Sequence, residues 1–215
     1  MTHEDTPSAA VTSAGFAGVI VAGGRASRLG QPKATALVGG ELLLARALEA
    51  VAGMPVVVVG GPELDAVIGG RPAAARVRET PPFSGPAAAI GAGCAELDRR
   101  GWASEWLVLL ACDLPFASAA VEVLLAAIPS LAPDEDGVCF RIDGRPQWLC
   151  GVYRRAVVRA GLDVVDGSTG LVSAPVRALF TDARLRLLDD PGDLAFDIDT
   201  PDDLHTADER LADHP

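Results

Sequence analysis

Lysine is almost absent from this chain of 215 residues: Lys33 is the only one, and all other basic side chains apart from histidine are arginines. Basic residues as a group are also scarce, 18 against 29 acidic ones, which gives a formal net charge of -11. A general binder of nucleic acids or anionic membranes needs positive charge over its surface. The composition therefore disfavours both as partners, and any phosphate ligand must meet a local basic site.

Cysteines and long hydrophobic runs are also few. The four cysteines show no CxxC or other paired metal spacing, and Cys112 and Cys139 stand inside apolar runs, which favours reduced, buried thiols. The longest apolar runs reach about half of the roughly 20 residues that a membrane-spanning helix requires. The N-terminus carries acids where a signal peptide needs positive charge. We expect a cytoplasmic protein with no membrane span.

Hydrophobic residues, by contrast, make up 49% of the chain, and the mean hydropathy is +0.28. This is enough for a core and excludes intrinsic disorder. Short apolar runs that end at turn residues predict buried parallel strands, and helical periodicity lies between them. The predicted strands are Phe16–Ala22, Val56–Val59 and Trp106–Ala111, and the predicted helices are Glu41–Val51, Pro86–Leu97 and Ser118–Ile128. The alternation predicts an α/β fold with a single doubly wound, mostly parallel sheet.

The pattern changes in the last third of the chain. Gly137–Ile142 and Gln147–Tyr153 flank Asp143-Gly144, a pair of turn residues typical of a β-hairpin. A helix is expected to begin near Tyr153. Thr200-Pro201 predicts the start of the last helix, because it places a threonine at the N-cap and a proline in the first helical position.

Two segments near the ends of the chain have unusual compositions. Residues 1–15 are small, polar and aperiodic, and we expect a flexible tail there, which leaves 16–212 as one domain. Ten acidic residues lie between Asp189 and Asp213, and Arg210 is the only lysine or arginine among them. We expect most of these acidic residues to lie on a helix and to be exposed to solvent.

A glycine-rich loop, Val21-Ala-Gly-Gly-Arg-Ala-Ser-Arg-Leu-Gly-Gln-Pro-Lys33, directly follows the first predicted strand. Its glycines let backbone amides approach a phosphate closely, at the sheet edge where α/β folds bind ligands. Arg25, Arg28 and Lys33 add positive charge. The spacing excludes a Walker loop, and no G-x-G-x-x-G follows this strand. A lone lysine in a chain that otherwise uses arginine indicates a site that needs a compact ammonium group.

This loop resembles the signature of the molybdenum cofactor guanylyltransferase family. Further segments match the family in the same order over nearly the whole chain: Ser84-Gly-Pro-Ala-Ala-Ala-Ile90, Ala111-Cys-Asp-Leu-Pro115, Gly144-Arg-Pro-Gln-Trp-Leu-Cys-Gly-Val-Tyr-Arg154 and Asp197-Ile-Asp-Thr-Pro201. The resemblance implies a Rossmann-like three-layer sandwich, similar to nucleotide-diphospho-sugar transferases, as a nucleotidyltransferase domain over 16–212. It also implies Mg²⁺-dependent transfer of GMP from GTP to a molybdopterin-type cofactor, with molybdoenzymes or their insertion chaperones as partners.

The resemblance assigns catalytic roles to Lys33, Arg28 and Asp113. Asp113 follows an apolar strand, where a carboxylate is well placed for a hard cation such as Mg²⁺. A helix N-cap is the structural alternative for this residue. Asp197 and Asp199 are the further candidate metal ligands. They lie on a short predicted strand, which places both carboxylates on one face.

The nucleotide-binding set that the resemblance implies extends beyond the loop. Its members are Val21, Ala22, Gly23, Gly24, Arg25, Ser27, Lys33, Gly60, Glu79, Thr80, Gly85, Pro86 and Asp113. Relatives carry an aspartate near Thr80 that helps to recognise the nucleotide, and either Glu79 or Thr80 is the candidate for this role here. Gly85-Pro86 predicts a turn into a helix whose N-terminus can face an anion. Arg145 is a candidate contact for the second substrate or, equally, a surface arginine of the hairpin.

Other functions remain open at this point. A CTP-dependent molybdopterin cytidylyltransferase is favoured by Gly30-Gln-Pro-Lys33 and disfavoured by Gly144-Arg-Pro146, where such enzymes usually have Gly-His-Pro. A non-catalytic cofactor-binding or chaperone homologue would need neither Lys33 nor Asp113. A sugar nucleotidyltransferase fits the loop alone, but the chain is short for one.

Overall fold

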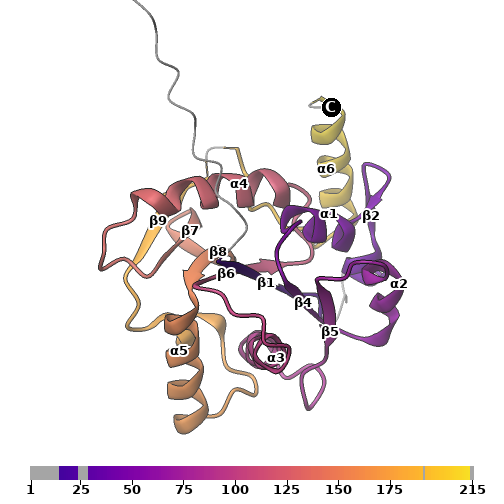
Figure 1. The fold of residues 1–215 in the computed structure, drawn as a ribbon. Coiled ribbons are helices and arrows are strands. Elements are labelled where there is room, and N and C mark those ends of the chain that lie inside the picture. Colours follow the sequence, from indigo (N-terminus) through magenta and orange to yellow (C-terminus); the bar gives the residue numbers. More distant parts are fainter. Residues whose placement is uncertain (1–14, 24–28, 191, 214–215) are drawn as a thin grey trace, which may run out of the picture.

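The computed structural model describes residues 15–23, 29–190 and 192–213. Its centre is a seven-stranded sheet in the order β5-β4-β1-β6-β8-β7-β9, and within this sheet only β8 runs against the others (Figure 1). The strands are β1 (Phe16–Val21), β4 (Val56–Val59), β5 (Ala74–Val77), β6 (Trp106–Ala111), β7 (Gly137–Ile142), β8 (Arg145–Arg154) and β9 (Leu185–Asp189). The predicted doubly wound, mostly parallel central sheet is confirmed, and a separate two-stranded sheet lies outside it.

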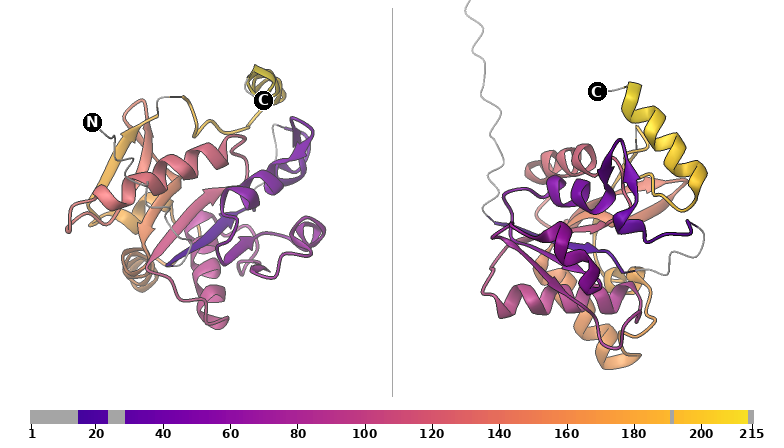
Figure 2. Two further views of the ribbon diagram at one scale, coloured as in Figure 1. Left: turned by 45° about the horizontal axis from the view of Figure 1, so that its top comes forward. Right: turned by 90° about the vertical axis from the view of Figure 1, so that its right-hand side faces the viewer.

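Helices cover both faces of this sheet, which gives three layers (Figures 1 and 2). On one face lie α1 (Leu43–Ala50), α2 (Asp65–Ile68) and α4 (Ala117–Ala127), and on the other lie α3 (Pro86–Arg99) and α5 (Arg155–Ser168). Short 3-10 turns are η1 (Lys33–Thr35), η2 (Pro62–Leu64), η3 (Ile128–Ser130) and η4 (Val176–Phe180).

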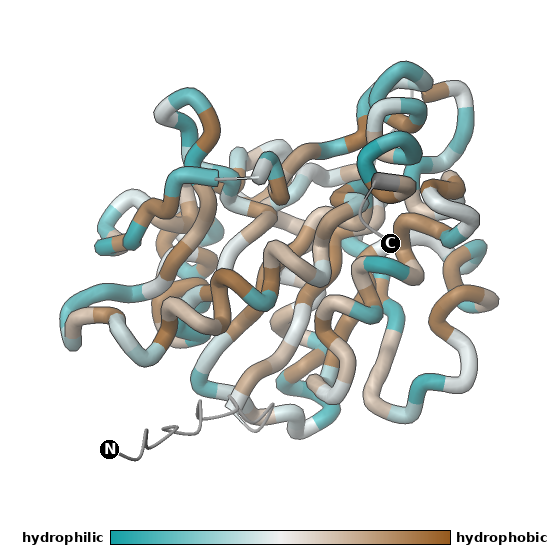
Figure 3. Tube along the Cα trace, turned by 90° about the horizontal axis from the view of Figure 1, so that it is seen from above, coloured by the Kyte–Doolittle hydropathy of each residue, from teal (hydrophilic) through white to brown (hydrophobic). Residues whose placement is uncertain are grey.

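The central strands are apolar throughout because each contributes to two cores. In β1, Ile20 packs into the core beneath α1 and α4, whereas Val19 packs into the core beneath α3 and α5, and both are fully buried. Side chains alternate along a strand, so a strand covered on both faces needs apolar residues at every position. Figure 3 shows these hydrophobic stretches through the middle of the molecule and hydrophilic stretches in the outer loops.

Two predicted boundaries need correction. The segment Glu41–Val51 does not begin as a helix, because β3 (Glu41–Leu42) first pairs with β2 (Leu37–Val38) in a two-stranded sheet, and α1 begins at Leu43. The helix expected near Tyr153 begins at Arg155, since β8 continues through Arg154. The edge strands β5 and β9 were not predicted.

The predicted hairpin is confirmed. β7 and β8 pair antiparallel on either side of Asp143-Gly144, whose φ angles are 49° and 75°. Two consecutive residues with positive φ are typical of the tight turn that joins twisted antiparallel strands. Through this hairpin the chain reverses, so β8 lies next to β6 and brings the residues after Arg145 close to the end of β6.

The last helix, α6 (Pro201–Asp213), begins where the sequence predicts. The Thr200 hydroxyl accepts a hydrogen bond from the Asp203 amide at 3.3 Å, and the Asp203 carboxylate accepts bonds from the amides of Asp199 and Thr200 at 2.9 and 2.7 Å. These reciprocal bonds cap the helix, because they satisfy the Asp203 amide in its first turn and the two amides just before it. α6 packs beside β2 on a third, smaller core (Figure 2).

The prediction of a short strand at Asp197–Asp199 is wrong. These residues do not form a strand. The Ile198 amide instead donates a hydrogen bond to the Asp113 carbonyl at 3.1 Å, outside any strand pairing. The segment is held by side chains, because the buried Ile198 enters the third core and Asp203 takes the next two amides. The two carboxylates therefore do not share one face of a sheet.

Several other expectations concern the ends of the chain and the thiols. Apart from Gly15, the expected tail 1–15 lies outside the described residues. All four cysteines are buried free thiols, as predicted for Cys112 and Cys139. In the part of the chain that is described, no helix combines the length and apolar character needed to cross a membrane.

Candidate active site

A cleft of ≈ 500 Å³ lies at the carboxyl ends of β1, β4, β5 and β6. It is built mostly from chain that directly follows these strands, since parallel strands deliver their ends to one sheet edge. Of the residues predicted for the site, it is lined by Val21, Ala22, Gly23, Lys33, Gly60, Glu79, Gly85, Pro86, Asp113 and Asp199. Gly24, Arg25, Ser27 and Arg28 lie outside the described residues.

Three charged side chains meet in this cleft. The Lys33 ammonium is 2.7 Å from Asp113 Oδ2 and 2.6 Å from Asp199 Oδ1. Lys33 begins the turn η1, Asp113 follows β6, and Asp199 precedes α6. Asp113 is not a helix cap, because the N-cap of α4 is Phe116. The sequence-predicted lysine and two of the predicted carboxylates are thus brought together from segments up to 166 positions apart.

The surroundings of Lys33 favour its charged form. Burial acts to lower the pKa of this amine, but the ion pairs and hydrogen bonds with Asp113 and Asp199 outweigh it and raise the pKa above the ordinary 10.5. A raised pKa means that less free amine is present at any pH below it. Lys33 therefore stays an ammonium throughout the physiological range.

This protonation predicts slow acylation. At pH 9 we expect an amine-reactive ester to label Lys33 about tenfold or more slowly than an ordinary exposed lysine, because each unit of raised pKa removes tenfold of the free amine. Peptide mapping by mass spectrometry reads the site directly, since Lys33 is the only lysine. The variant Asp113→Asn should speed the labelling. Labelling of the native protein at the ordinary rate would contradict the ion-paired arrangement.

The Asp113 carboxylate retains an acceptor that the protein leaves unused. Its Oδ1 is buried and has no hydrogen-bond partner among the described residues. A buried carboxylate oxygen without a donor is costly, which indicates a cation or a donor that arrives with a ligand. A cation, the Lys33 ammonium, already lies between Asp113 and Asp199. The Asp113 and Asp199 carboxylates are therefore also suited to bind a hard divalent cation.

The remaining candidate ligand, Asp197, faces elsewhere. It lines a second cavity of ≈ 310 Å³, whereas Asp199 lines the main cleft, and Asp113 lines both. Burial raises the pKa of Asp197, and the nearby carboxylates of Asp113 and Asp199 raise it further. Within the described ranges, no group of three histidine, cysteine or acidic side chains is placed to hold a metal ion without other ligands. Mg²⁺ commonly uses one or two carboxylates together with substrate phosphates.

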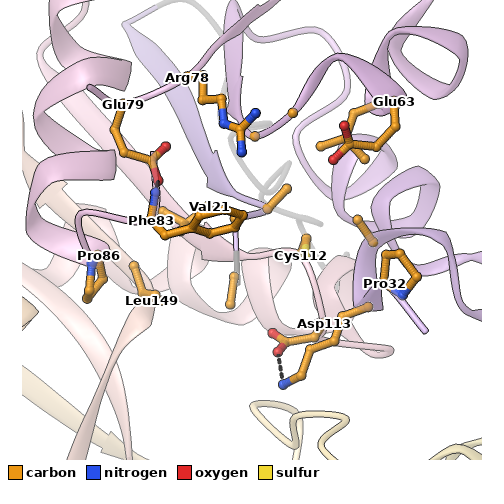
Figure 4. A pocket seen from close by; sticks show the side chains of 18 of the residues that line it. Val21, Pro32, Glu63, Arg78, Glu79, Phe83, Pro86, Cys112, Asp113 and Leu149 are labelled. Atoms are coloured by element: carbon orange, nitrogen blue, oxygen red, sulfur yellow. Dashed lines mark hydrogen bonds and ion pairs between the residues drawn. The ribbon is translucent and has the colours of Figure 1, made fainter. Parts of the chain in front are cut away.

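The other end of the cleft contains Glu79. Its side chain is buried, with 6% exposed, and Oε1 accepts a hydrogen bond from the Phe83 amide at 2.9 Å (Figure 4). Oε2 is buried and has no partner among the described residues. Thr80, the other candidate for the family aspartate, is exposed and does not line the cleft. Of the two candidates Glu79 and Thr80, Glu79 is therefore the one that lines the cleft.

The MobA-like NTP transferase domain family matches residues 18–183. The chain belongs to this family. Its members are nucleotidyltransferases, and the elements around the cleft lie within the matched region or, like Asp199, just beyond it. No functionally curated protein matches the chain.

Solved structures share the nucleotidyltransferase fold. Molybdopterin-guanine dinucleotide biosynthesis protein A from Archaeoglobus fulgidus is 21% identical, with a TM-score of 0.67 over 92% of this chain and 99% of that one. 4-Diphosphocytidyl-2C-methyl-D-erythritol synthase from Anaerococcus prevotii is 17% identical, with a TM-score of 0.67 over 93% and 97%. Rv0371c from Mycobacterium tuberculosis is 23% identical, with a TM-score of 0.65 over 92% and 100%.

Several residues of the main cleft were missed by sequence reasoning. Glu63, Arg78 and Phe83 line it, and the Arg78 guanidinium lies 5.1 Å from the centroid of the Phe83 ring. Phe83 is 53% exposed and has a φ of 62°. A positive φ in a bulky residue is uncommon and often marks a functional site, but it is visible only in the folded chain.

The second cavity adjoins the main cleft at Asp113. Its wall includes Gln147 and Trp148 from β8, and the Trp148 ring stacks on Phe180 at 5.3 Å with an interplanar angle of 5°. Arg145, the predicted contact for a second substrate, is exposed at the start of β8 and is not part of this wall. The two cavities share Asp113, Ala111 and Leu149.

Proposed function

We propose that this protein transfers GMP from GTP to a molybdopterin-type cofactor that carries a terminal phosphate, giving the guanine dinucleotide cofactor and pyrophosphate. The observation that carries the proposal is the meeting of Lys33 with Asp113 and Asp199 at the junction of two cavities. A transferase needs two substrates with their reacting groups in contact, and Asp113 lines both cavities. The nucleotide takes the main cleft and the acceptor takes the second cavity.

The chemistry requires alignment and charge neutralisation more than proton transfer. An oxygen of the acceptor phosphate attacks the α-phosphorus of the nucleotide, the bond to the bridging oxygen breaks, and pyrophosphate leaves. A phosphate monoester is already ionised near neutral pH, so no general base is required. The Lys33 ammonium neutralises charge on the phosphates as they pass through the transition state. The backbone at Gly23, which lines the main cleft directly after β1, is proposed to help hold the nucleotide in line with the acceptor.

Asp113 and Asp199 are the residues proposed to hold Mg²⁺. When bound, this ion would supply positive charge to the phosphates of the nucleotide. Asp197, in the wall of the second cavity, is proposed to interact with the acceptor or with the hydration shell of the ion.

Glu79 supports guanine as the base. A carboxylate oxygen accepts hydrogen bonds and donates none when ionised, and guanine presents two adjacent donors, N1–H and the 2-amino group. Cytosine presents only its 4-amino group beside an acceptor nitrogen. Oε2 of Glu79, buried and without a partner among the described residues, suits the guanine edge better. The Trp148 ring, held by Phe180 on one side, lies in the wall of the second cavity and suits contact with the ring system of a pterin-type acceptor.

Thermal unfolding with GTP, CTP, ATP or UTP, each with Mg²⁺, tests the nucleotide. Binding at a hundredfold excess over Kd adds about 2.7 kcal/mol of stability, which corresponds to about 5–10 °C for a chain of this size. We expect the largest shift with GTP, and pyrophosphate release with GTP only when the molybdopterin-type acceptor is present. The largest shift with CTP would support the cytidylyltransferase. Absence of any shift would favour a non-catalytic binding protein.

A further inference from the structure

Arg210 is the only lysine or arginine among the ten acids between Asp189 and Asp213, and the structure gives it unusual partners. Its guanidinium lies 4.1 Å from the ring centroid of Phe116 and 5.5 Å from that of Phe196. It also donates hydrogen bonds to the Asp193 carboxylate at 3.0 Å and to the Gly192 carbonyl at 2.7 Å. This arginine therefore joins α6 to two separate loops.

Each of the two rings belongs to a loop that carries a candidate metal ligand. Phe116 comes three residues after Asp113, at the N-cap of α4. Phe196 comes three residues before Asp199. The loops themselves share one backbone hydrogen bond, from the Ile198 amide to the Asp113 carbonyl at 3.1 Å. Arg210 is a side-chain bridge beside this backbone contact.

The third core adds to the same connection. Phe116 and Phe196 both pack against a buried cluster that includes Ile198 and Ala207, and Ala207 lies on α6 one turn before Arg210. A guanidinium that stacks on aromatic faces and also donates hydrogen bonds has a well-defined orientation. Helix α6 thus holds the loop of Asp113 against the loop of Asp199.

We propose that Arg210 is a positioning residue, which sets the separation of Asp113 and Asp199 so that both carboxylates reach one cation. The proposal rests on the proposed function for the identity of that cation, but the geometry is already visible, because both carboxylates lie within 2.7 Å of the Lys33 ammonium. Two like charges repel each other. Lys33 offsets this repulsion without metal, but a bound divalent cation must approach the same two carboxylates, so the separation of their loops has to be held by packing outside the ion pairs.

The variants Arg210→Ala and Phe196→Leu test this role. The second keeps Arg210 and most of the apolar volume but removes one stacking ring. Arg99→Ala is the matched control, since it also removes one arginine and an ion pair, with Glu96 on α3. Three measurements are made on each folded variant: Mn²⁺ binding by electron paramagnetic resonance, the Mg²⁺ dependence of pyrophosphate release, and the rate of Lys33 acylation.

Loss of residues that orient metal ligands commonly weakens metal binding by about 10- to 100-fold. We expect Arg210→Ala to weaken Mn²⁺ binding by about tenfold, to raise the Mg²⁺ requirement by a similar factor, and to speed Lys33 acylation. At saturating Mg²⁺, kcat should return to within a few-fold of the native value, with KM for the nucleotide unchanged. Phe196→Leu should give smaller changes in the same directions, and Arg99→Ala none.

The outcomes separate this proposal from the proposed function. Faster Lys33 acylation and weaker Mn²⁺ binding in Arg210→Ala would support positioning even if GTP proved not to be the substrate. Unchanged Mn²⁺ affinity and unchanged Lys33 labelling in folded Arg210→Ala would overturn it, as would equal losses in Arg99→Ala. A lower kcat that extra Mg²⁺ does not restore would also overturn it, because it would indicate a role other than spacing the two carboxylates.

Discussion

Replacing Lys33 with alanine is expected to lower kcat by about 100- to 1000-fold while the fold remains intact, because one lost charge contact to the transition state costs about 3–4 kcal/mol. The ammonium is held at the junction of the two cavities by Asp113 and Asp199, and it is the only lysine in the chain. Pyrophosphate release measures kcat, and circular dichroism checks the fold.

The thermal stability of Lys33→Ala is a second expected result of losing these ion pairs. Without Lys33, the partly buried Asp113 loses its cation partner, so the thermal midpoint should fall in the absence of metal and recover when Mg²⁺ is added. Lys33→Arg keeps the charge, but a planar guanidinium cannot take the place of a compact ammonium between two carboxylates, so it should restore little of the rate. Near-native turnover in Lys33→Ala would mean that Lys33 has no catalytic role and acts only as an ion-pair partner in the fold.

Asp113→Asn is expected to lower Mg²⁺-dependent turnover by about a hundredfold or more, and by more than Asp199→Asn. Asp113 lines both cavities and has a side chain that is only 14% exposed, against 48% for Asp199. Its Oδ1 is buried and has no hydrogen-bond partner among the described residues. Substitution with asparagine therefore removes the negative charge of the less exposed of the two proposed metal ligands. Electrostatic contacts are stronger where water is excluded.

The comparison of the two asparagine variants is made by titrating Mg²⁺ against turnover, with circular dichroism as the control for folding. Asp199→Asn retains an amide oxygen that can still bind the cation or its water, so higher Mg²⁺ should restore much of its rate. Native rates and native Mg²⁺ dependence in Asp113→Asn would place the metal site elsewhere. A larger loss in Asp199→Asn would make Asp199 the principal ligand.

The central fold was predictable because its strands are short apolar runs that end at glycine or aspartate. The four valines of Val56–Val59, closed by two glycines, favour a buried strand, and the Asp143-Gly144 turn requires positive φ angles that these residues tolerate. The edge strand Leu185–Asp189 was not predictable in the same way. Its residues are only partly buried, and its pairing with β7 depends on a partner about 48 positions away.

For the candidate site, sequence alone determined the residue types and their order: a glycine-rich loop with one lysine, an aspartate after an apolar strand, and an acidic pair before the last helix. It did not determine which carboxylates meet. Asp197 and Asp199 were expected on one face of a strand, whereas the folded chain directs them to different cavities, because Ile198 enters the third core and Asp203 binds the amides after it. Only long-range packing decides such directions. Likewise, Arg210 in an acidic stretch indicated no more than a solvated helix until tertiary packing stacked it on Phe116 and Phe196.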